Sequence, residues 1–244
     1  MEKLIYTAMS GAQHTLMAQQ IRANNLANVN TPGFRADFER VSAQSIVGDG
    51  YQSRVMARQE QAGSDFKAGA LMQTGRKLDV AIRGEGFLTV QTVDGQEAYT
   101  RAGNLEADAD GLLTLNGRPV LGDGGELVLP AYRDISFGKD GTLSITPPGG
   151  GAQLEVGRLK LVSPDTRDLV KGGDGLFRLR QGGEAEASEL VVLASEFLEG
   201  SNVNAVDELV SSMALTRNFE LQVKLMKSAD DQARQGARLI SGQG

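Results

Sequence analysis

The chain has 244 residues, of which 40% are hydrophobic, and is long enough for one large or two modest domains with a buried core. Its formal net charge of −6 leaves no basic surface to neutralise a phosphate backbone and argues against a nucleic-acid partner. The absence of cysteine excludes disulfides, thiolate metal sites and cysteine nucleophiles.

The sequence has no sign of a membrane span or of the usual cleaved signal. No window approaches the roughly 18 consecutive apolar residues that suggest a spanning helix. The N-terminal residues MEKLIYTAM lack the charged region, the continuous apolar stretch and the small-residue cleavage site of a secretory signal. We therefore expect no direct membrane insertion and no cleaved signal peptide.

Residues 2–28 predict a long N-terminal helix, because they contain no proline. Apolar residues recur in it at heptad spacing, as in a coiled-coil seam in which only Gln19 is polar. The seam positions are Ile5, Met9, Ala12, Leu16, Gln19, Ala23 and Leu26. Between Leu4 and Phe34 the only formally charged side chain is Arg22, whereas a solvated surface carries about 25–35% charged residues. The helix is therefore either surrounded by neighbouring subunits or packed inside its own subunit.

A run of asparagines ends this helix in the segment ANNLANVNTPGF, residues 23–34. Asn24, Asn25 and Asn28 lie on neighbouring helical positions. Asparagine is unfavourable inside a helix unless its amide finds partners, so we expect these amides to bond to the backbone of another segment. Pro-Gly then fits the central positions of a type II turn. The segment predicts a stopped helix and a redirected chain, although an ordinary helix exit is also consistent with it.

The middle of the chain predicts short strands and tight turns, since 23 of the 31 glycines lie between Gly63 and Gly183. Asp94-Gly95, Asn116-Gly117 and Asp140-Gly141 each predict a type I′ hairpin turn between strand-like runs. The glycine-rich segment at 146–152 is either a break between two β subregions or a long loop. The acidic segment at 106–111 lacks the final glutamate of a calcium loop and predicts a hairpin turn.

Residues 204–241 predict a second, longer helix that is also free of proline. Asn204 is a suitable N-cap, and Asp207 and Glu208 place acidic side chains in the first turn, where the helix dipole favours them. A looser heptad follows at Leu209, Ser212, Thr216, Phe219, Val223, Met226, Asp230, Ala233, Ala237 and Ile240.

Two other classes of function compete with a structural role. An enzyme is disfavoured because His14 is the only histidine and no cysteine is present, so we expect no catalytic residue, metal site or cofactor. A secreted β-rich binding module is disfavoured because the chain has no tryptophan and 5% aromatic residues. A binding module of this kind would also not account for the two long terminal helices.

Several longer segments resemble one known family. NNLANVNTPGFR, GALMQTGRKLDVAIRGEGFLTV with YTRAGNLEADADGLLTLNGRPVLG, and LEGSNVNAVDELVSSM are similar, in this order, to motifs of the flagellar rod and hook family, the axial proteins of the bacterial flagellum. The runs IYTAMSGA, GRLKLV, GDGLFRL and TRNFELQVKLMKSADD look most like those of a proximal-rod subunit. A distal-rod subunit of the same family is the alternative.

The resemblance implies a structural subunit with no catalysis. Family members pair their terminal helices into a coiled-coil domain that lines an axial tube, with a β-rich domain outside it. They stack helically with other rod subunits in the periplasm and pass torque from the motor to the hook. They are exported by the flagellar type III apparatus, which would explain the missing cleaved signal.

The resemblance also assigns residues and domains. The junction between helix and connector would comprise Asn24, Asn25, Leu26, Ala27, Asn28, Thr31, Pro32, Gly33 and Phe34, with Asn202 and Asn204 on the returning chain. We expect an α+β multidomain fold whose long N- and C-terminal helices pair as a coiled coil around a central all-β domain. The expected boundaries are 1–30 for the N-terminal helix, 31–76 for an extended connector, 77–200 for the β-rich domain and 201–244 for the C-terminal helix.

Overall fold

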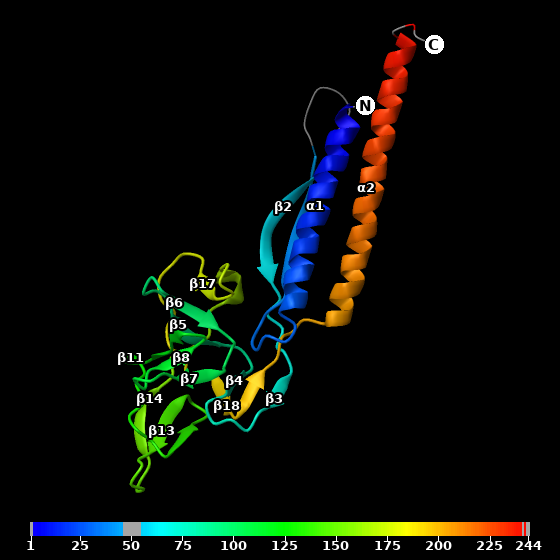
Figure 1. The fold of residues 1–244 in the computed structure, drawn as a ribbon. Coiled ribbons are helices and arrows are strands. Elements are labelled where there is room, and N and C mark those ends of the chain that lie inside the picture. Colours follow the sequence, from blue (N-terminus) through cyan, green and yellow to red (C-terminus); the bar gives the residue numbers. More distant parts are fainter. Residues whose placement is uncertain (1, 46–54, 241, 243–244) are drawn as a thin grey trace. The chain divides into compact units, whose positions relative to one another are not determined.

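The computed structural model describes residues 2–45, 55–240 and 242 and divides the chain into two compact units (Figure 1). The helical unit combines Met1–Ala27, Asp37–Ser64 and Val203–Gly244. The β unit combines Asn28–Ala36 and Asp65–Asn202. The chain therefore passes between the units four times, at the two junctions that the sequence motifs mark and at each end of 37–64.

The helical unit contains the two predicted terminal helices, α1 (Glu2–Ala27) and α2 (Ala205–Ile240). They lie side by side, and a hairpin of β1 (Asp37–Ser45) and β2 (Val55–Ser64) runs along α1 (Figure 1). The prediction of two long terminal helices is confirmed, while their pairing as a coiled coil stays a prediction. Residues 37–45 and 55–64, which the sequence analysis places in a connector, form these two antiparallel strands, and the predicted domain boundaries also stay a prediction.

The start of α2 follows the capping rules. The Asn204 side-chain Oδ1 accepts a hydrogen bond of 3.0 Å from the Val206 backbone amide, and the Asn204 carbonyl accepts one of 3.0 Å from the Glu208 amide. Asp207 and Glu208 occupy the first turn, as expected from the helix dipole.

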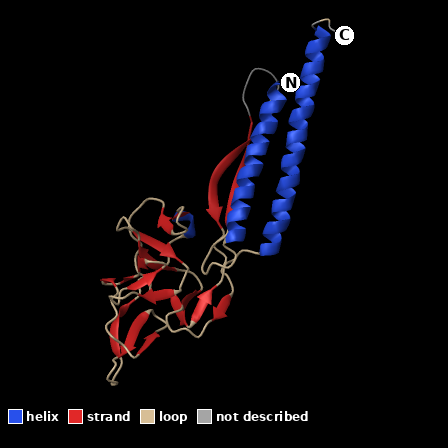
Figure 2. Cartoon of the chain, viewed as in Figure 1, coloured by secondary structure: helices blue, strands red, loops and turns tan. Residues whose placement is uncertain are grey.

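The β unit is built from antiparallel strands joined by short loops, with one short 3-10 helix, η1 (Thr166–Asp168) (Figure 2). Its largest sheet has five strands, β15 (Leu161–Val162), β5 (Phe87–Gln91), β6 (Glu97–Thr100), β17 (Phe177–Leu179) and β16 (Leu169–Lys171), in this spatial order. A three-stranded sheet joins β12 (Asp134–Phe137), β13 (Thr142–Thr146) and β14 (Leu154–Arg158). Another joins β7 (Leu105–Ala107), β8 (Leu113–Leu115) and β9 (Arg118–Pro119).

Three further strand pairs complete the β unit. They are β4 (Val80–Arg83) with β18 (Val192–Ser195), β3 (Leu71–Gln73) with β19 (Phe197–Glu199), and β10 (Leu121–Gly122) with β11 (Gly125–Glu126). The central β-rich region predicted from the sequence is thus confirmed. Of the glycine-rich segment at 146–152, Thr146 ends β13 and the other residues lie in the hairpin loop between β13 and β14, so the segment is a loop and not a break.

Two apolar clusters hold the β unit together. The larger cluster draws buried aliphatic side chains from most of the strands between 80 and 193. The smaller cluster is aromatic: Phe87, Tyr99 and Phe177 pack with Val162 and Leu169. Phe66 closes it, with its ring centroid 5.1 Å from that of Phe177. Both clusters join residues that are far apart in the sequence, so the β unit has a hydrophobic core of its own.

The hairpin turns correct part of the sequence prediction. Asn116 and Gly117 have φ values of 51° and 77°, which confirms a type I′ turn. Asp94 and Asp140 do not take a positive φ; only the glycine after each does. The amide of Gly95 instead bonds to the carbonyl of residue 92, and that of Gly141 to residue 138, so each loop is a type I turn that ends in a left-handed glycine. The two type I′ predictions there were wrong, because one glycine suffices for the longer loop.

Candidate assembly site

Asn25, near the C-terminal end of α1, joins three segments of the helical unit. Its side chain is fully buried. The Nδ2 group donates to the Asp37 carbonyl at 2.9 Å, and Oδ1 accepts from the Asp37 amide at 2.9 Å. The amide thus acts as a strand partner for the start of β1. The expectation that an asparagine amide bonds to the backbone of another segment is confirmed for this residue.

Glu208 of α2 is the second anchor of the helical unit. Its buried carboxylate accepts from Asn25 Nδ2 at 3.1 Å and from Arg22 Nη1 at 3.1 and 3.2 Å. Arg22 is the only charge on α1 between Leu4 and its C-terminus, and it lies against α2 of the same chain. The rest of the α1 surface over this range is therefore uncharged.

The contacts between α1 and α2 are largely polar or small. Thr15 Oγ1 lies 3.2 Å from Gln222 Oε1, and Gln19 Nε2 donates to Thr216 Oγ1 at 3.3 Å. A Cβ on Gly11 would lie 3.0 Å from the Gln222 amide nitrogen, so the absence of a side chain there allows close approach. Hydrogen bonds fix the alignment of such a helix pair but bury little apolar area.

The predicted seam residues differ in how far they are buried. Met9 and Leu16 are 44% and 43% exposed, and Leu209 and Val223 are 48% and 42% exposed. Ala12 is buried, Ala23 is exposed, and Leu26, Phe219, Met226 and Ala233 are half-buried. The side chains of Ile5 and Ile240 lie outside the described residues. A role for the seam in assembly stays a prediction.

Thr31, Pro32, Gly33 and Phe34 form the predicted type II turn, which belongs to the β unit. The Phe34 amide bonds to the Thr31 carbonyl at 3.2 Å, and Gly33 has a φ of 70°. The Gly33 amide donates to the Glu199 carbonyl at 2.7 Å. A Cβ on Gly33 would lie 2.1 Å from the Ala102 amide nitrogen, so the turn needs glycine both for its conformation and for its packing.

A buried ion cluster that sequence reasoning missed lies beneath this turn. Glu199 Oε1 accepts from Arg35 Nη2 at 2.7 Å and from the Gly69 amide at 2.9 Å, while Oε2 accepts from Arg101 Nη1 at 3.1 Å. Glu199 and Arg35 are each 1% exposed. Burial lowers the pKa of Arg101, and the Glu199 carboxylate partly opposes this. In the sequence, the three charged residues of the cluster stand in the family motifs, as the arginine of GFR, the arginine of YTR and the glutamate of LEG.

Asn202 ties the returning chain to the same turn. Its Oδ1 accepts from the Ala36 amide at 2.7 Å, and its Nδ2 donates to the carbonyls of Asp65 at 2.7 Å and Lys67 at 3.1 Å. Lys171 covers the turn, with its Nζ 3.9 Å from the Phe34 ring centroid and donating to the Arg35 carbonyl at 2.8 Å. The junction residues thus hold chain segments together.

The remaining junction residues lie nearer the surface. Asn28 Oδ1 accepts from Thr31 Oγ1 at 3.1 Å, and Asn24 and Ala27 are exposed.

His14 Nδ1 lies 3.5 Å from Glu39 Oε1 of β1, in a contact between helix and hairpin. Across the described residues, no group of three or more His, Asp or Glu side chains is arranged to hold a metal ion. None of the described helices combines the length and apolar character needed to cross a lipid bilayer.

Family models match three stretches of the chain. Residues 5–35 match "Flagella basal body rod protein", residues 81–145 match "Flagellar hook protein FlgE/F/G D1 domain", and residues 194–239 match "Flagellar basal body rod FlgEFG protein C-terminal". The first and last stretches contain the two junctions.

Whole-chain relatives agree with these matches. The chain is 40% identical to the flagellar basal-body rod protein FlgF of Escherichia coli and 39% identical to that of Salmonella typhimurium, in each case over 99% of both chains. It is 33% identical to FlgG of Bacillus subtilis over 95% of this chain and 96% of the relative. The chain therefore belongs to the flagellar rod family, is most like the FlgF proteins within it, and is a structural protein rather than an enzyme.

Proposed function

We propose that the chain is a proximal-rod subunit of the flagellar basal body, which polymerises helically through its terminal helices and transmits torque from the motor to the hook. Its relatives are named as basal-body rod proteins, which locates the family in the basal body and implies other rod subunits as partners. A distal-rod subunit is the second candidate, because the FlgG relative aligns over nearly the whole chain.

The observation that carries the proposal is the surface of the helical unit. Large apolar side chains stay exposed on both helices, among them Tyr6 and Met17 of α1 and Met213 and Leu221 of α2. Exposed apolar surface of this extent marks an interaction surface on a soluble protein. Copies packed around an axis would bury it, and burial stabilises by about 25 cal/mol per Å² before the cost of ordering is subtracted.

The proposal includes a route and a location. The subunit would leave the cytoplasm through the flagellar type III export apparatus without a cleaved signal peptide and would assemble in the periplasm. Contacts that run head to tail without closing on themselves give an open helical assembly, as a rod requires. The predicted junction residues would then set the angle at which the helices enter the rod.

The direct test is to label the subunit in the bacterium that encodes it and to image isolated basal bodies. The label should lie in the rod, and deletion of the subunit should leave cells without complete basal bodies. Leu16→Asp should abolish motility without altering the unfolding of the purified subunit, because Leu16 is exposed. Leu190→Asp, at an exposed position of the β unit, is the control and should leave cells motile. Motile deletion cells would refute the proposal.

A further inference from the structure

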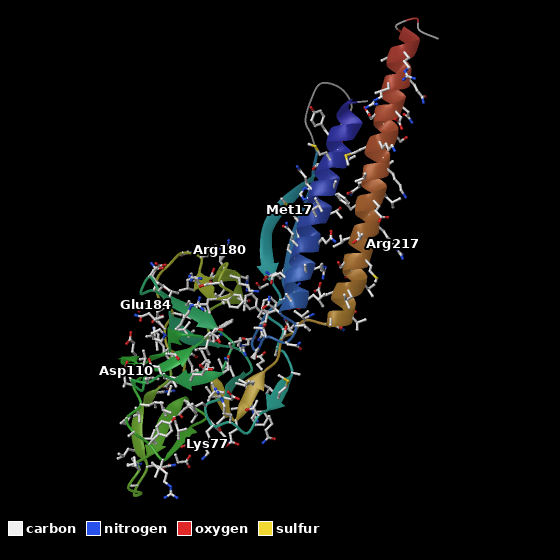
Figure 3. The ribbon with its side chains drawn as sticks, in the orientation of Figure 1. Met17, Lys77, Asp110, Arg180, Glu184 and Arg217 are labelled. Atoms are coloured by element: carbon white, nitrogen blue, oxygen red, sulfur yellow. The ribbon has the colours of Figure 1, made fainter. Side chains whose placement is uncertain are left out.

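The two-residue turn between β8 and β9 contains the only asparagine of the sequence that is followed by glycine. Asn116 and Gly117 are both exposed, with φ values of 51° and 77°. A Cβ on Gly117 would meet no atom within 4 Å, so the turn is open to water on this side. Figure 3 labels Asp110, which lies in the loop at the other end of β8.

A second asparagine, Asn104, contacts the side chain of Asn116. β7 and β8 pair with Leu105 opposite Leu115. One position further along both strands, the same register places Asn104 opposite Asn116, where cross-strand side chains meet. Asn104 Nδ2 donates a hydrogen bond of 3.2 Å to Asn116 Oδ1. This bond polarises the side-chain carbonyl of Asn116 and makes its carbon, Cγ, easier to attack.

The backbone nitrogen of Gly117 is the nucleophile that can attack this carbon from within the chain. Its attack on Asn116 Cγ closes a succinimide ring, and the absence of a Cβ on Gly117 lets the nitrogen approach. Among the residues that the structure describes, none accepts a hydrogen bond from the Gly117 amide. Its proton can therefore pass directly to solvent hydroxide.

We propose that Asn116 deamidates spontaneously in the folded subunit and that the Asn104 amide accelerates the reaction. The Gly117 nitrogen loses its proton to hydroxide and forms a bond to Asn116 Cγ. Negative charge develops on Oδ1, which accepts the hydrogen bond from Asn104 Nδ2, as in an oxyanion hole. The Cγ–Nδ2 bond then breaks, and the amide group leaves as ammonia after taking a proton from water. Water opens the succinimide to aspartate or to isoaspartate.

Both products change the turn. Aspartate adds a negative charge next to Arg118, whose Nη2 lies 3.6 Å from Asp174 Oδ2. Isoaspartate adds a carbon to the main chain, so the lengthened loop no longer fits a two-residue turn that pairs Leu115 with Arg118. The reaction therefore alters the charge and the shape of this hairpin as the subunit ages.

Peptide mapping of the purified full-length subunit after incubation in neutral buffer tests the site, because mass spectrometry detects the conversion of amide to acid. Asn30 is the internal control. It is also exposed and in a turn, but β-branched Thr31 follows it, and the Thr31 amide donates to the Asn28 carbonyl at 3.1 Å. Asn116 should deamidate about tenfold or more faster than Asn30, and faster at higher pH, because its nucleophile is unhindered and must lose a proton. A smaller ratio would overturn the site.

Substitution of Asn104 tests the accelerating contact. Asn104→Ala should slow deamidation of Asn116 about fivefold, the factor that a hydrogen bond of about 1 kcal/mol contributes to a barrier. Asn104→Gln, which keeps an amide donor, should recover part of the rate, and in urea all three proteins should react alike. Hydrogen exchange of the peptide covering 113–119 checks the turn; if alanine opens it, Asn104→Asp, which keeps the side-chain size but cannot donate, gives the same test. An unchanged or faster rate without the donor would overturn the role of Asn104.

Discussion

The buried carboxylate of Glu199 accepts hydrogen bonds from two arginines and a backbone amide in the β unit. It lies between Arg35 and Arg101, which are 164 and 98 residues away in the sequence. Arg101 also donates to the Gly84 carbonyl at 2.6 Å and lies 5.3 Å from the Phe87 ring centroid. Breaking a buried ion cluster is costly because the remaining charges lose their partner in a dry environment. The cluster therefore links the segment that contains the turn to the rest of the β unit.

Glu199→Gln should destabilise the β unit by about 3–5 kcal/mol, since two buried guanidinium groups lose their counter-charge. The measurement is the free energy of unfolding in urea, followed by hydrogen exchange of peptides from residues 65–202. Glu189→Gln is the control, because the Glu189 side chain is 88% exposed, and it should change the free energy by less than about 0.5 kcal/mol. Equal effects of the two changes would show that the cluster carries no special weight.

Asp174 offers a pH-dependent contribution at the residue scale. Paired hydrogen bonds from Arg178, at 3.0 and 2.8 Å, lower the pKa of Asp174 from 3.8 to about 2. A lowered pKa in the folded state gives stability that is present above the unfolded pKa and is lost as the pH falls through the folded one. Asp174→Asn should thus destabilise the β unit at pH 6, by an amount that shrinks below pH 4 and vanishes near pH 2. Urea unfolding of both proteins across this range measures it; a pH-independent difference would contradict it.

At the scale of elements, the segment before β1 owes its shape to a turn that only glycine can complete. Gly33 has a φ of 70°, and its Cα faces the backbone of Arg101 and Ala102. Gly75 has a similar φ of 73°, yet a Cβ there would meet no atom within 4 Å. Comparing Gly33 with Gly75 separates two costs of adding a side chain. Both positions share the cost of a left-handed backbone, but only Gly33 also has the cost of close packing against backbone.

Gly75→Ala should cost about 1–2 kcal/mol, the usual penalty for a side chain in the left-handed region. Gly33→Ala should cost distinctly more, because its Cβ collides with backbone that cannot move aside. It should also expose residues 28–36 to rapid proteolysis. Digestion rates and urea unfolding of the two variants measure the difference, and similar losses would mean that the turn does not pack as described.

The helix pair behaves differently from the β unit as an element. Hydrogen bonds between α1 and α2 are made by side-chain hydroxyl and amide groups and by the Arg22–Glu208 ion pair. The net contribution of a typical hydrogen bond is only about 1 kcal/mol, and many large apolar side chains of both helices stay exposed. The pair is therefore aligned but weakly held within one subunit.

At the scale of the whole molecule, the two units should differ in stability. The β unit has two apolar clusters, whereas the helical unit buries few large apolar side chains among those the structure describes. Limited proteolysis of the dilute subunit should cut within α1 and α2 first and leave a fragment of about residues 28–202, as expected for weakly held termini. Mass spectrometry identifies the fragment. Helices as resistant as the β strands would contradict this expectation, and a high subunit concentration that promotes assembly should slow the cuts.

Some features followed from the residues alone. Missing prolines, the Asn204 cap and the Pro-Gly turn gave the two helices and the redirected chain, because these effects act within a few residues. The type I′ turn at Asn116-Gly117 was also predicted correctly. Type I′ turns at Asp94-Gly95 and Asp140-Gly141 were not, because an Asp-Gly pair is compatible with more than one length of hairpin loop.

The sequence by itself determined the two terminal helices, the β-rich middle and the family, because local chain geometry and long motifs carry that information. Only the tertiary structure decided which face of each helix lies against the other helix, because a heptad pattern does not say which surface covers it. It also decided that Arg35, Glu199 and Arg101 meet, because contacts between residues far apart in the chain depend on how the strands pack.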